Sequence, residues 1–229
     1  DLTALCVAIE ELARVDSGLA ITLEAGVGLG ANPVHKFGSE AQKREWLPRL
    51  CSGEVLGAFG LTEPGGGSDA GATRTTARLD GDQWVIDGTK SFITNSGTDI
   101  TGFVIVTAVT GQQADGAREI SAILVPSGTP GLTVAPPYSK VGWNTSDTHE
   151  LSLSGVRVPA ANLVGERGRG YAQFLQILDE GRIAISALAV GLAQGCVDEC
   201  VRYAREREAF GRPIGANQYN PADCPPPLG

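Results

Sequence analysis

The sequence contains no methionine, and its 229 residues include only two histidines and five cysteines. His35 and His149 lack the spacing of paired metal ligands, so we expect no metal site. The cysteines are odd in number and irregularly spaced, and none forms a C-x-x-C pair. This pattern indicates reduced, structural thiols of an intracellular protein. Because the chain begins at Asp1, inside an apolar periodic pattern, we expect it to be a fragment or a processed product.

Positive charge and long apolar runs are also scarce. The chain has 18 Lys and Arg against 26 Asp and Glu, a net charge of −8. Such a balance argues against a nucleic-acid or anionic-membrane surface. No uninterrupted apolar run approaches the roughly 18 residues of a membrane span, and no charged-then-apolar leader is present. We therefore expect no membrane span, and a location in the cytoplasm, or in the mitochondrial matrix if the source is eukaryotic.

Residues 1–54 have helical periodicity. Apolar residues from Leu2 to Ala13 recur at spacings of three and four, which predicts an amphipathic helix. Asp16-Ser17 can cap a second helix that ends near Ala25. Ser39–Gln42 is a capping box that opens a third helix.

A glycine pattern interrupts this helical region. Gly26–Ala31 fits the G-x-G-x-x-A fingerprint of dinucleotide sites, which requires a preceding strand. Here helical pattern precedes it, and Asn32-Pro33, which should stop the helix, follows. We interpret these glycines as close helix packing or a ligand-facing helix end rather than a Rossmann site.

From Val55 the apolar period changes from helical to two. About seven short segments with little helix between them predict an antiparallel barrel or sandwich. Asp80-Gly81 and Asp87-Gly88 are typical hairpin-turn dipeptides. The predicted strands cover residues 73–79, 83–86, 89–94, 102–108, 119–125, 132–135 and 149–153.

From about Gly170 the helical period returns for about 40 residues. A helix of this length with internal glycines implies a bundle, because it cannot bury its own apolar stripe alone. After Gln218 four prolines and no periodicity predict an irregular tail. The expected division is 1–54 helical, 55–165 β, 166–218 the first long helix of a C-terminal helical domain, and 219–229 tail.

The most informative stretch is Gly57–Asp69, a short apolar strand followed by three consecutive glycines, Gly65 to Gly67. Such a run is tolerated where the backbone approaches a ligand closely or adopts positive φ. Backbone N–H groups with the hydroxyls of Thr62 and Ser68 on one concavity would suit an anionic or carbonyl-rich ligand. An ordinary turn between strands is an equally open interpretation of these residues alone.

This stretch resembles the first signature of the acyl-CoA dehydrogenase family, and other segments resemble later landmarks in the same order. The resemblance covers roughly positions 1–218. It implies an α+β multidomain fold with FAD held between a central β domain and a C-terminal four-helix bundle. The other matching segments are Lys90–Asn95, Lys140–Trp143, Ser146–Thr148, Asp179–Arg182 and Arg205–Gly211.

The resemblance implies specific flavin contacts. Phe59, Leu61 and Thr62 match positions that line the isoalloxazine ring, and Ser68 matches a residue at the flavin diphosphate and the thioester ligand. Phe92 matches an aromatic against the ring, and Thr94 a hydroxyl near flavin N5. Without the motif, core packing is the expectation for Phe59 and Phe92.

Three further positions match residues that reach the FAD of a neighbouring subunit: Arg207, Phe210 and Gln218. They imply a homodimer or homotetramer. Arginine suits the diphosphate because its planar fork pairs bidentately with phosphate oxygens. Ala209 replaces a threonine found in many relatives. From charge pattern alone, Arg205–Glu208 is equally well a solvated helix end.

Asp179 and Arg182 match positions at the acyl-CoA pantetheine. Because they are three residues apart on one helix face, an intrahelical ion pair is the structural alternative. The family's base, a glutamate, lies in most members beyond the end of this chain. In a minority it lies one place before the arginine, where this chain has Gly181. Glu180 is about 100° around the helix and is not assigned.

The resemblance therefore implies FAD-dependent α,β-dehydrogenation of an acyl-CoA to the trans-2-enoyl-CoA in fatty acid β-oxidation. Electrons would pass to an electron-transfer flavoprotein. Two alternatives stay open. One is a flavin oxidase on the same fold, using O₂. The other is a non-catalytic remnant that binds flavin or acyl-CoA, because the base is missing and the end is rich in proline.

Overall fold

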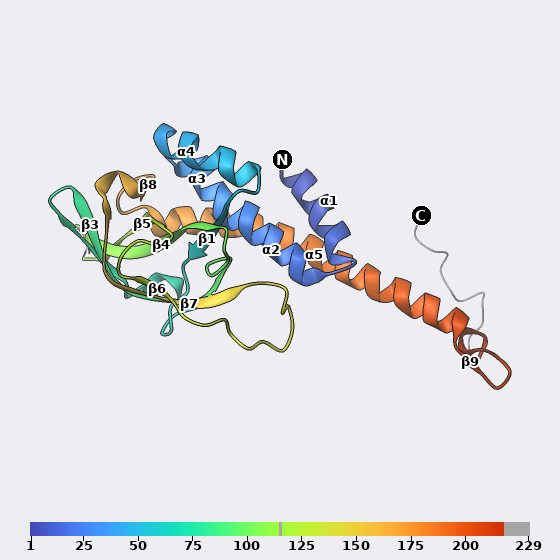
Figure 1. Cartoon of the computed structure of the whole chain (residues 1–229). Coiled ribbons are helices and arrows are strands. Elements are labelled where there is room, and N and C mark those ends of the chain that lie inside the picture. Colours follow the sequence, from blue (N-terminus) through green and yellow to red (C-terminus); the bar gives the residue numbers. More distant parts are fainter. Residues whose placement is uncertain (115, 218–229) are drawn as a thin grey trace.

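The structure is a computed structural model that describes residues 1–114 and 116–217. A helical segment is followed by a β-sheet and then by one long helix, as the sequence predicts (Figure 1). The predicted flavin contact Gln218 and the predicted tail at 219–229 lie outside the described residues.

The three predicted N-terminal helices are present, and the two caps that the sequence predicts are formed. The Asp16 carboxylate accepts hydrogen bonds from the N–H groups of Gly18 and Leu19. Ser39 and Gln42 form the complete capping box. Satisfying these N–H groups fixes where each helix begins. The helices are α1 (Leu2–Ala13), α2 (Ser17–Glu24), α3 (Asn32–Phe37), which was not predicted, and α4 (Glu40–Cys51).

The glycine segment is a π-helix, η1 (Ala25–Ala31), which continues directly into α3. The prediction that Asn32-Pro33 stops the helix is wrong. Pro33 lies in the first turn of α3, where a missing N–H is tolerated. A Cβ on Gly30 would lie 2.5 Å from the Gly57 carbonyl oxygen, so the glycine allows the helix to pack directly on the sheet. No strand precedes the glycines, which excludes a Rossmann site.

Eight strands form one mixed sheet. Its order is β6-β7-β3-β2-β4-β5-β8, with β1 paired to β4 outside this path. Both β1 and β2 run parallel to β4, whereas the remaining pairs are antiparallel, so the sheet is not purely antiparallel as predicted. The strands are β1 (Leu56–Gly60), β2 (Thr76–Asp80), β3 (Gln83–Thr94), β4 (Thr101–Gln112), β5 (Arg118–Pro126), β6 (Leu132–Val134), β7 (Thr148–Pro159) and β8 (Leu163–Val164).

One of the two predicted turns is wrong. Asp80-Gly81 does connect β2 to β3, and Gly81 has a φ of +64°. Asp87-Gly88 instead lies inside β3, where the register with β7 shifts between Ile86 and Gly88. A bulge accommodates the extra residue without ending the strand.

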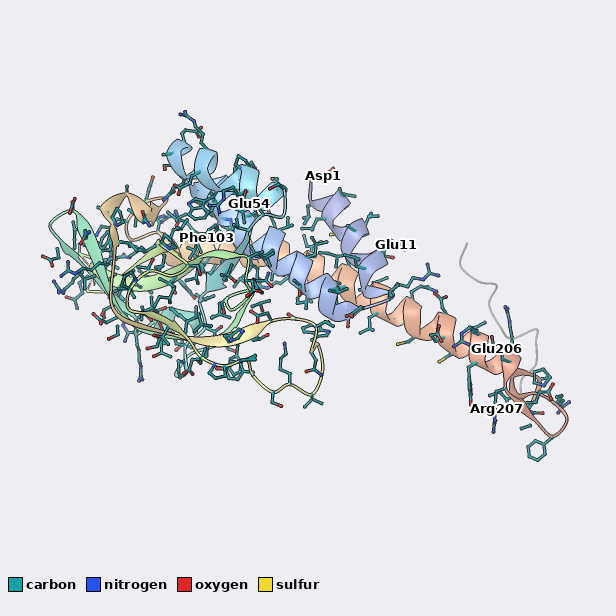
Figure 2. The ribbon with its side chains drawn as sticks, in the orientation of Figure 1. Asp1, Glu11, Glu54, Phe103, Glu206 and Arg207 are labelled. Atoms are coloured by element: carbon teal, nitrogen blue, oxygen red, sulfur yellow. The ribbon has the colours of Figure 1, made fainter. Side chains whose placement is uncertain are left out.

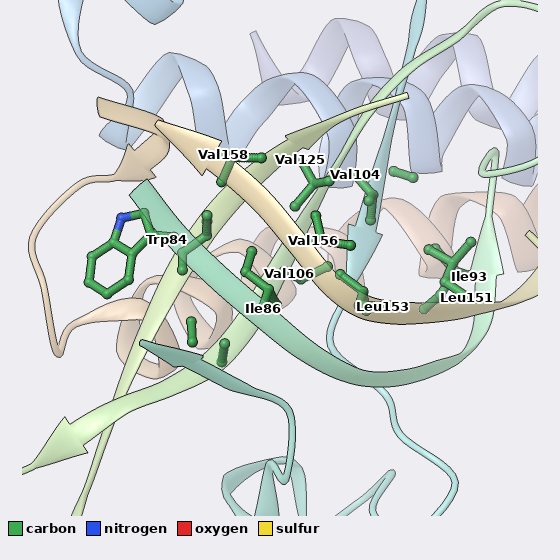
Figure 3. Close-up of a cluster of buried hydrophobic side chains, with 14 residues drawn as sticks. Trp84, Ile86, Ile93, Val104, Val106, Val125, Leu151, Leu153, Val156 and Val158 are labelled. Atoms are coloured by element: carbon green, nitrogen blue, oxygen red, sulfur yellow. The ribbon is translucent and has the colours of Figure 1, made fainter. Parts of the chain in front are cut away.

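The core has three parts. Alternate side chains of the strands meet on the concave side of the sheet, among them Ile86, Val106 and Val156 (Figure 3). A second cluster, which includes Trp46 and Phe174, joins the sheet to α4 and to the long helix α5 (Gly170–Glu206). A third cluster fills the space between α1, α2 and α5.

Helix α5 has 37 residues and extends well beyond the sheet (Figure 1). Glycines let it approach α1 closely, because a Cβ on Gly191 would lie 2.1 Å from the Glu10 carbonyl oxygen. Helix α5 is long and apolar enough to cross a membrane by length and composition alone, and 17% of its most apolar stretch of 18 residues is buried. A single such helix is weak evidence, since a helix packed in a bundle passes the same test. Two short strands, β9 (Glu208–Ala209) and β10 (Arg212–Pro213), follow α5.

Candidate functional site

A cavity of about 370 Å³ lies between the glycine loop, η1, the end of β3 and the start of α5. It brings together seven of the eleven site residues that the sequence predicts, one of which, Gln218, lies outside the described residues. Segments far apart in the sequence thus converge on one site. The seven residues are Phe59, Leu61, Thr62, Ser68, Phe92, Thr94 and Arg182, and the cavity is also lined by Ala25, Leu29, Gly67, Ala70, Ile93, Tyr171, Leu175 and Leu178.

The glycine loop turns tightly at Glu63 and Gly66, whose backbones exchange two hydrogen bonds of 3.1 Å. None of the three glycines has a positive φ, so close approach of the backbone is the alternative that stays open for them. Space is limiting at Gly66, where a Cβ would lie 3.0 Å from the Asp69 carbonyl oxygen. Gly67 lines the cavity, which brings backbone close to whatever the cavity holds.

A buried ion pair fixes this loop to the sheet. Lys90, on β3, has no exposed side-chain surface, and its Nζ donates to Glu63 Oε1 at 2.7 Å. Nζ also donates to the Leu61 carbonyl oxygen at 3.3 Å and to Thr107 Oγ1 at 3.1 Å. The Glu63 carboxylate accepts two backbone N–H groups as well, those of Arg74 at 2.7 Å and Thr75 at 3.1 Å.

The charges of this pair are stabilised by each other. Burial lowers the pKa of Lys90 to about 8, and Glu63 opposes this effect. Burial alone would raise the pKa of Glu63, but hydrogen bonding to Lys90 and Thr75 and the charge of Lys90 hold it below its ordinary value. Neither residue is among the site residues predicted from the sequence. The available signal was a lysine inside the predicted strand 89–94. Lysine is almost never buried unless it is paired.

The two aromatic residues have different environments. Phe59 stacks on Phe174, with ring centroids 3.8 Å apart, so it packs in the core and also lines the cavity. Phe92 is 65% exposed and has a φ of +60°. Its ring stacks on Tyr138, with centroids 4.9 Å apart. Core packing therefore accounts for Phe59 only, whereas Phe92 is held in an unfavourable backbone conformation beside the cavity.

On α5, Arg182 lines the cavity and Asp179 does not. The two form the intrahelical ion pair that was the structural alternative, with Nη1 and Oδ1 2.6 Å apart on exposed side chains. Glu180, which neighbours this pair in the sequence, is bonded to α3 instead of lining the cavity. It accepts hydrogen bonds from Lys36 and Asn32, which lower its pKa, Lys36 having the larger effect.

The other predicted flavin contacts lie far from this cavity. Arg207 follows the last residue of α5, at the opposite end of that helix (Figure 2). At 1.5 Å per residue, α5 spans roughly 55 Å. Phe210 is 96% exposed. Neither residue can contact a ligand in the cavity of its own chain.

Within residues 1–114 and 116–217, no group of three His, Cys, Asp or Glu side chains could hold a metal ion.

Family models match nearly the whole chain. They describe the N-terminal, middle and C-terminal domains of acyl-CoA dehydrogenase, and match residues 1–54, 58–156 and 168–220. The chain belongs to the acyl-CoA dehydrogenase family.

Individual relatives agree with this assignment. A probable acyl-CoA dehydrogenase of Bacillus subtilis is 50% identical over 95% of this chain and 57% of its own length. A short-chain specific acyl-CoA dehydrogenase of Megasphaera elsdenii is 43% identical over 93% of this chain and 55% of its own length. The chain thus spans little more than half the length of these relatives.

Solved structures give the same result for the fold. Butyryl-CoA dehydrogenase from Megasphaera elsdenii has a TM-score of 0.89 at 42% identity, covering 95% of this chain and 56% of that one. An acyl-CoA dehydrogenase complexed with FAD from Bacillus anthracis has a TM-score of 0.87 at 38% identity, covering 94% and 36%. A chain from a structure described as an electron transferring flavoprotein of Acidaminococcus fermentans has a TM-score of 0.89 at 42% identity, covering 95% and 57%.

Proposed function

We propose that the protein containing this chain is an FAD-dependent acyl-CoA dehydrogenase, which oxidises an acyl-CoA thioester to the trans-2-enoyl-CoA. The main support is the single cavity shared by the six predicted flavin contacts nearest the glycine loop and by Arg182. In the proposed division of labour, residues 55–165 bind the flavin, and residues 1–54 and 166–218 complete its pocket.

The residues of the cavity fit a flavin. Its volume of about 370 Å³ lies in the range of small-molecule sites. Apolar side chains such as Leu61 and Phe92 suit the faces of a planar ring, and the hydroxyls of Thr62, Ser68 and Thr94 suit its polar edge. The Glu63–Lys90 pair would hold Thr62 in place, because Lys90 also binds the neighbouring Leu61 carbonyl.

The chemistry that FAD supplies when bound is acceptance of a hydride from the β carbon as the α proton is removed. In our proposal, Thr62 and Thr94 orient the ring, and Ser68 and Arg182 hold the thioester ligand. The base that takes the α proton would be a glutamate outside this sequence, since Gly181 has no side chain and Glu180 is bonded to α3.

We further propose that Arg207, Phe210 and Gln218 contact the FAD of a neighbouring subunit, so that the protein is a homodimer or homotetramer. The position of Arg207 at the far end of α5 is compatible with such a role (Figure 2). We propose an electron-transfer flavoprotein as the electron acceptor, and the cytoplasm, or the mitochondrial matrix in a eukaryote, as the location.

The test is a spectroscopic titration of the purified protein after loading with FAD. We expect acyl-CoA thioesters of some chain length to bleach the oxidised flavin absorbance in the absence of oxygen. If no chain length from four to sixteen carbons bleaches a bound flavin, the dehydrogenase proposal is wrong and the non-catalytic alternative is favoured. Hydrogen peroxide formed at the rate of substrate loss in air would instead favour an oxidase.

A further inference from the structure

The last residue of α2, Glu24, is a buried carboxyl group without a hydrogen-bond partner at Oε1 in the described part of the chain. Its side chain is 1% exposed. This is unusual, because buried polar atoms are nearly always hydrogen-bonded and each exception needs an explanation.

Two glycines make room for this carboxyl group. A Cβ on Gly28 of η1 would lie 2.7 Å from Glu24 Oε1, and a Cβ on Gly181 of α5 would lie 3.3 Å from it. Side chains at these positions would therefore crowd the carboxyl. The glycine pattern in η1, which has no dinucleotide role, thus has a second use beside helix packing.

The carboxyl group lies just behind the inner wall of the cavity. Ala25 and Leu29, which line the cavity, are on the same helical segment as Glu24. Leu29 also meets the same face of Gly181, since its Cδ2 would lie 3.7 Å from a Cβ there. Glu24 itself does not line the cavity, so Leu29 would have to adopt another rotamer for a ligand to reach Oε1.

The raised pKa of Glu24 and its unpaired acceptor are those of a buried carboxyl group that a hydrogen-bond donor would stabilise. Burial raises its pKa to about 7, and no cation within residues 1–114 and 116–217 offsets this effect. An unpartnered acceptor in an apolar wall is costly, and a ligand that supplies a donor removes that cost. An alkyl group placed against the Glu24 carboxyl supplies no donor, so the free-energy cost of the unpaired acceptor remains.

We propose that Glu24 is a specificity-determining residue, which makes the inner end of the cavity select acyl groups that carry a hydrogen-bond donor, such as a hydroxyl, beyond the β carbon. This inference rests on the proposed acyl-CoA function, because it assigns the inner end of the same cavity to the acyl group. The outer end, at Ser68 and Phe92, would hold the flavin and the thioester.

The test compares ligands that bind without reacting. In 3-thiapentanoyl-CoA and 3-thiahexanoyl-CoA a sulfur replaces the β carbon, so no hydride can leave. Each is measured with and without a terminal hydroxyl, by calorimetry on the FAD-loaded protein. The variants are Glu24→Leu, which removes the acceptor, and Glu24→Gln, which keeps an acceptor oxygen of the same reach. Glu11→Leu on the exposed face of α1 is the matched control.

For at least one chain length, we expect the wild-type protein and the Glu11→Leu control to bind the hydroxylated ligand about fivefold more tightly than its plain counterpart. Glu24→Gln should keep this preference, and Glu24→Leu should reverse it. The inference is overturned if wild-type protein shows no preference at either length, or if Glu24→Leu keeps it. If wild-type protein binds none of the four esters, the acyl-CoA function itself is wrong, and the inference with it.

Discussion

Two buried glutamates lie beside the same cavity, and their environments are opposite. Glu63, in the glycine loop, accepts hydrogen bonds from Lys90 and from two backbone N–H groups. Glu24, at the inner end, has no partner for Oε1 among the residues that the structure describes. The pKa of Glu63 lies below its ordinary value and that of Glu24 is raised to about 7.

The difference comes from what the neighbouring elements supply. A lysine on β3 and the backbone N–H groups of Arg74 and Thr75 face Glu63, whereas glycines of η1 and α5 face Glu24. A fully bonded carboxylate fixes its surroundings, so the outer end of the cavity is a rigid frame. An unbonded carboxyl group remains able to change protonation and to accept a ligand, so the inner end is adaptable.

Removal of Lys90 would break the Glu63–Lys90 ion pair, and we expect it to have the largest effect on stability. In a Lys90→Met variant the carboxylate of Glu63 stays buried without its cation, which costs about 3–5 kcal/mol of unfolding free energy. Urea unfolding followed by circular dichroism measures this loss. The double variant Lys90→Met with Glu63→Gln should recover part of it, because the amide keeps an acceptor for the backbone N–H groups and carries no charge. A loss below about 1 kcal/mol for Lys90→Met would show that the pair does not hold the loop.

Titration of Glu24 would sharpen the comparison at the unpaired end. Because its folded pKa is about 7 and its ordinary value is 4.5, the folded state binds the proton more tightly. Its contribution to stability is full below pH 4.5 and is lost as the pH rises to about 7, a difference of about 3 kcal/mol. The free energy of unfolding of Glu24→Gln, measured from pH 4.5 to 8, should lack this component of the wild-type pH dependence. Parallel curves for the two proteins would contradict the unpaired state of Glu24.

The sequence predicted the helical and β regions well, because periodicity and capping are local signals. It also selected Thr62, Ser68 and Phe92, which the fold brings to one cavity. It failed at Asp87-Gly88, where pairing with β7 continues across a bulge that local turn preference does not reveal. The prediction that the helix stops at Pro33 failed, because the π-helix η1 ends directly before α3 and Pro33 lies in the first turn of α3, where proline is tolerated.

Glu24 and Glu63 could not be told apart in the sequence. Each is a single glutamate in a largely apolar stretch, and what it meets in the fold comes mainly from distant parts of the sequence. Lys90 is 27 residues from Glu63, and Gly181 is 157 residues from Glu24. Only the fold decides which carboxyl group meets a cation and which meets glycine.

A third prediction concerns the strained aromatic at the rigid end. A positive φ costs a non-glycine residue roughly 1–2 kcal/mol, and Phe92 has a φ of +60°. Phe92→Gly removes this strain and the ring together, so stability should change by less than about 1 kcal/mol. Phe92→Ala removes the ring and keeps the strain, and should be the less stable variant.

The affinity for FAD reports on the Phe92 ring alone, whereas stability also depends on the strained backbone. Both Phe92 variants should bind FAD about tenfold more weakly, since each lacks the aromatic contact. Fluorescence quenching of added FAD measures the affinity. If Phe92→Ala is as stable as Phe92→Gly, the backbone at this position is not strained, and if both bind FAD like the wild type, the ring does not contact the flavin.

The smallest effect on stability should come from the exposed pair on α5. Asp179 and Arg182 are largely exposed, so water screens their attraction and the pair contributes only a few tenths of a kcal/mol. Asp179→Asn should therefore leave the urea midpoint nearly unchanged, unlike any change at the buried Glu63–Lys90 pair. If Asp179 positions Arg182 for the thioester ligand, the same variant should still weaken the binding of 3-thiahexanoyl-CoA severalfold. If neither stability nor binding changes, the pair is only a feature of the helix surface. A loss of stability above about 1 kcal/mol would contradict the comparison with Glu63, because it would show that an exposed ion pair stabilises this protein as much as a buried one.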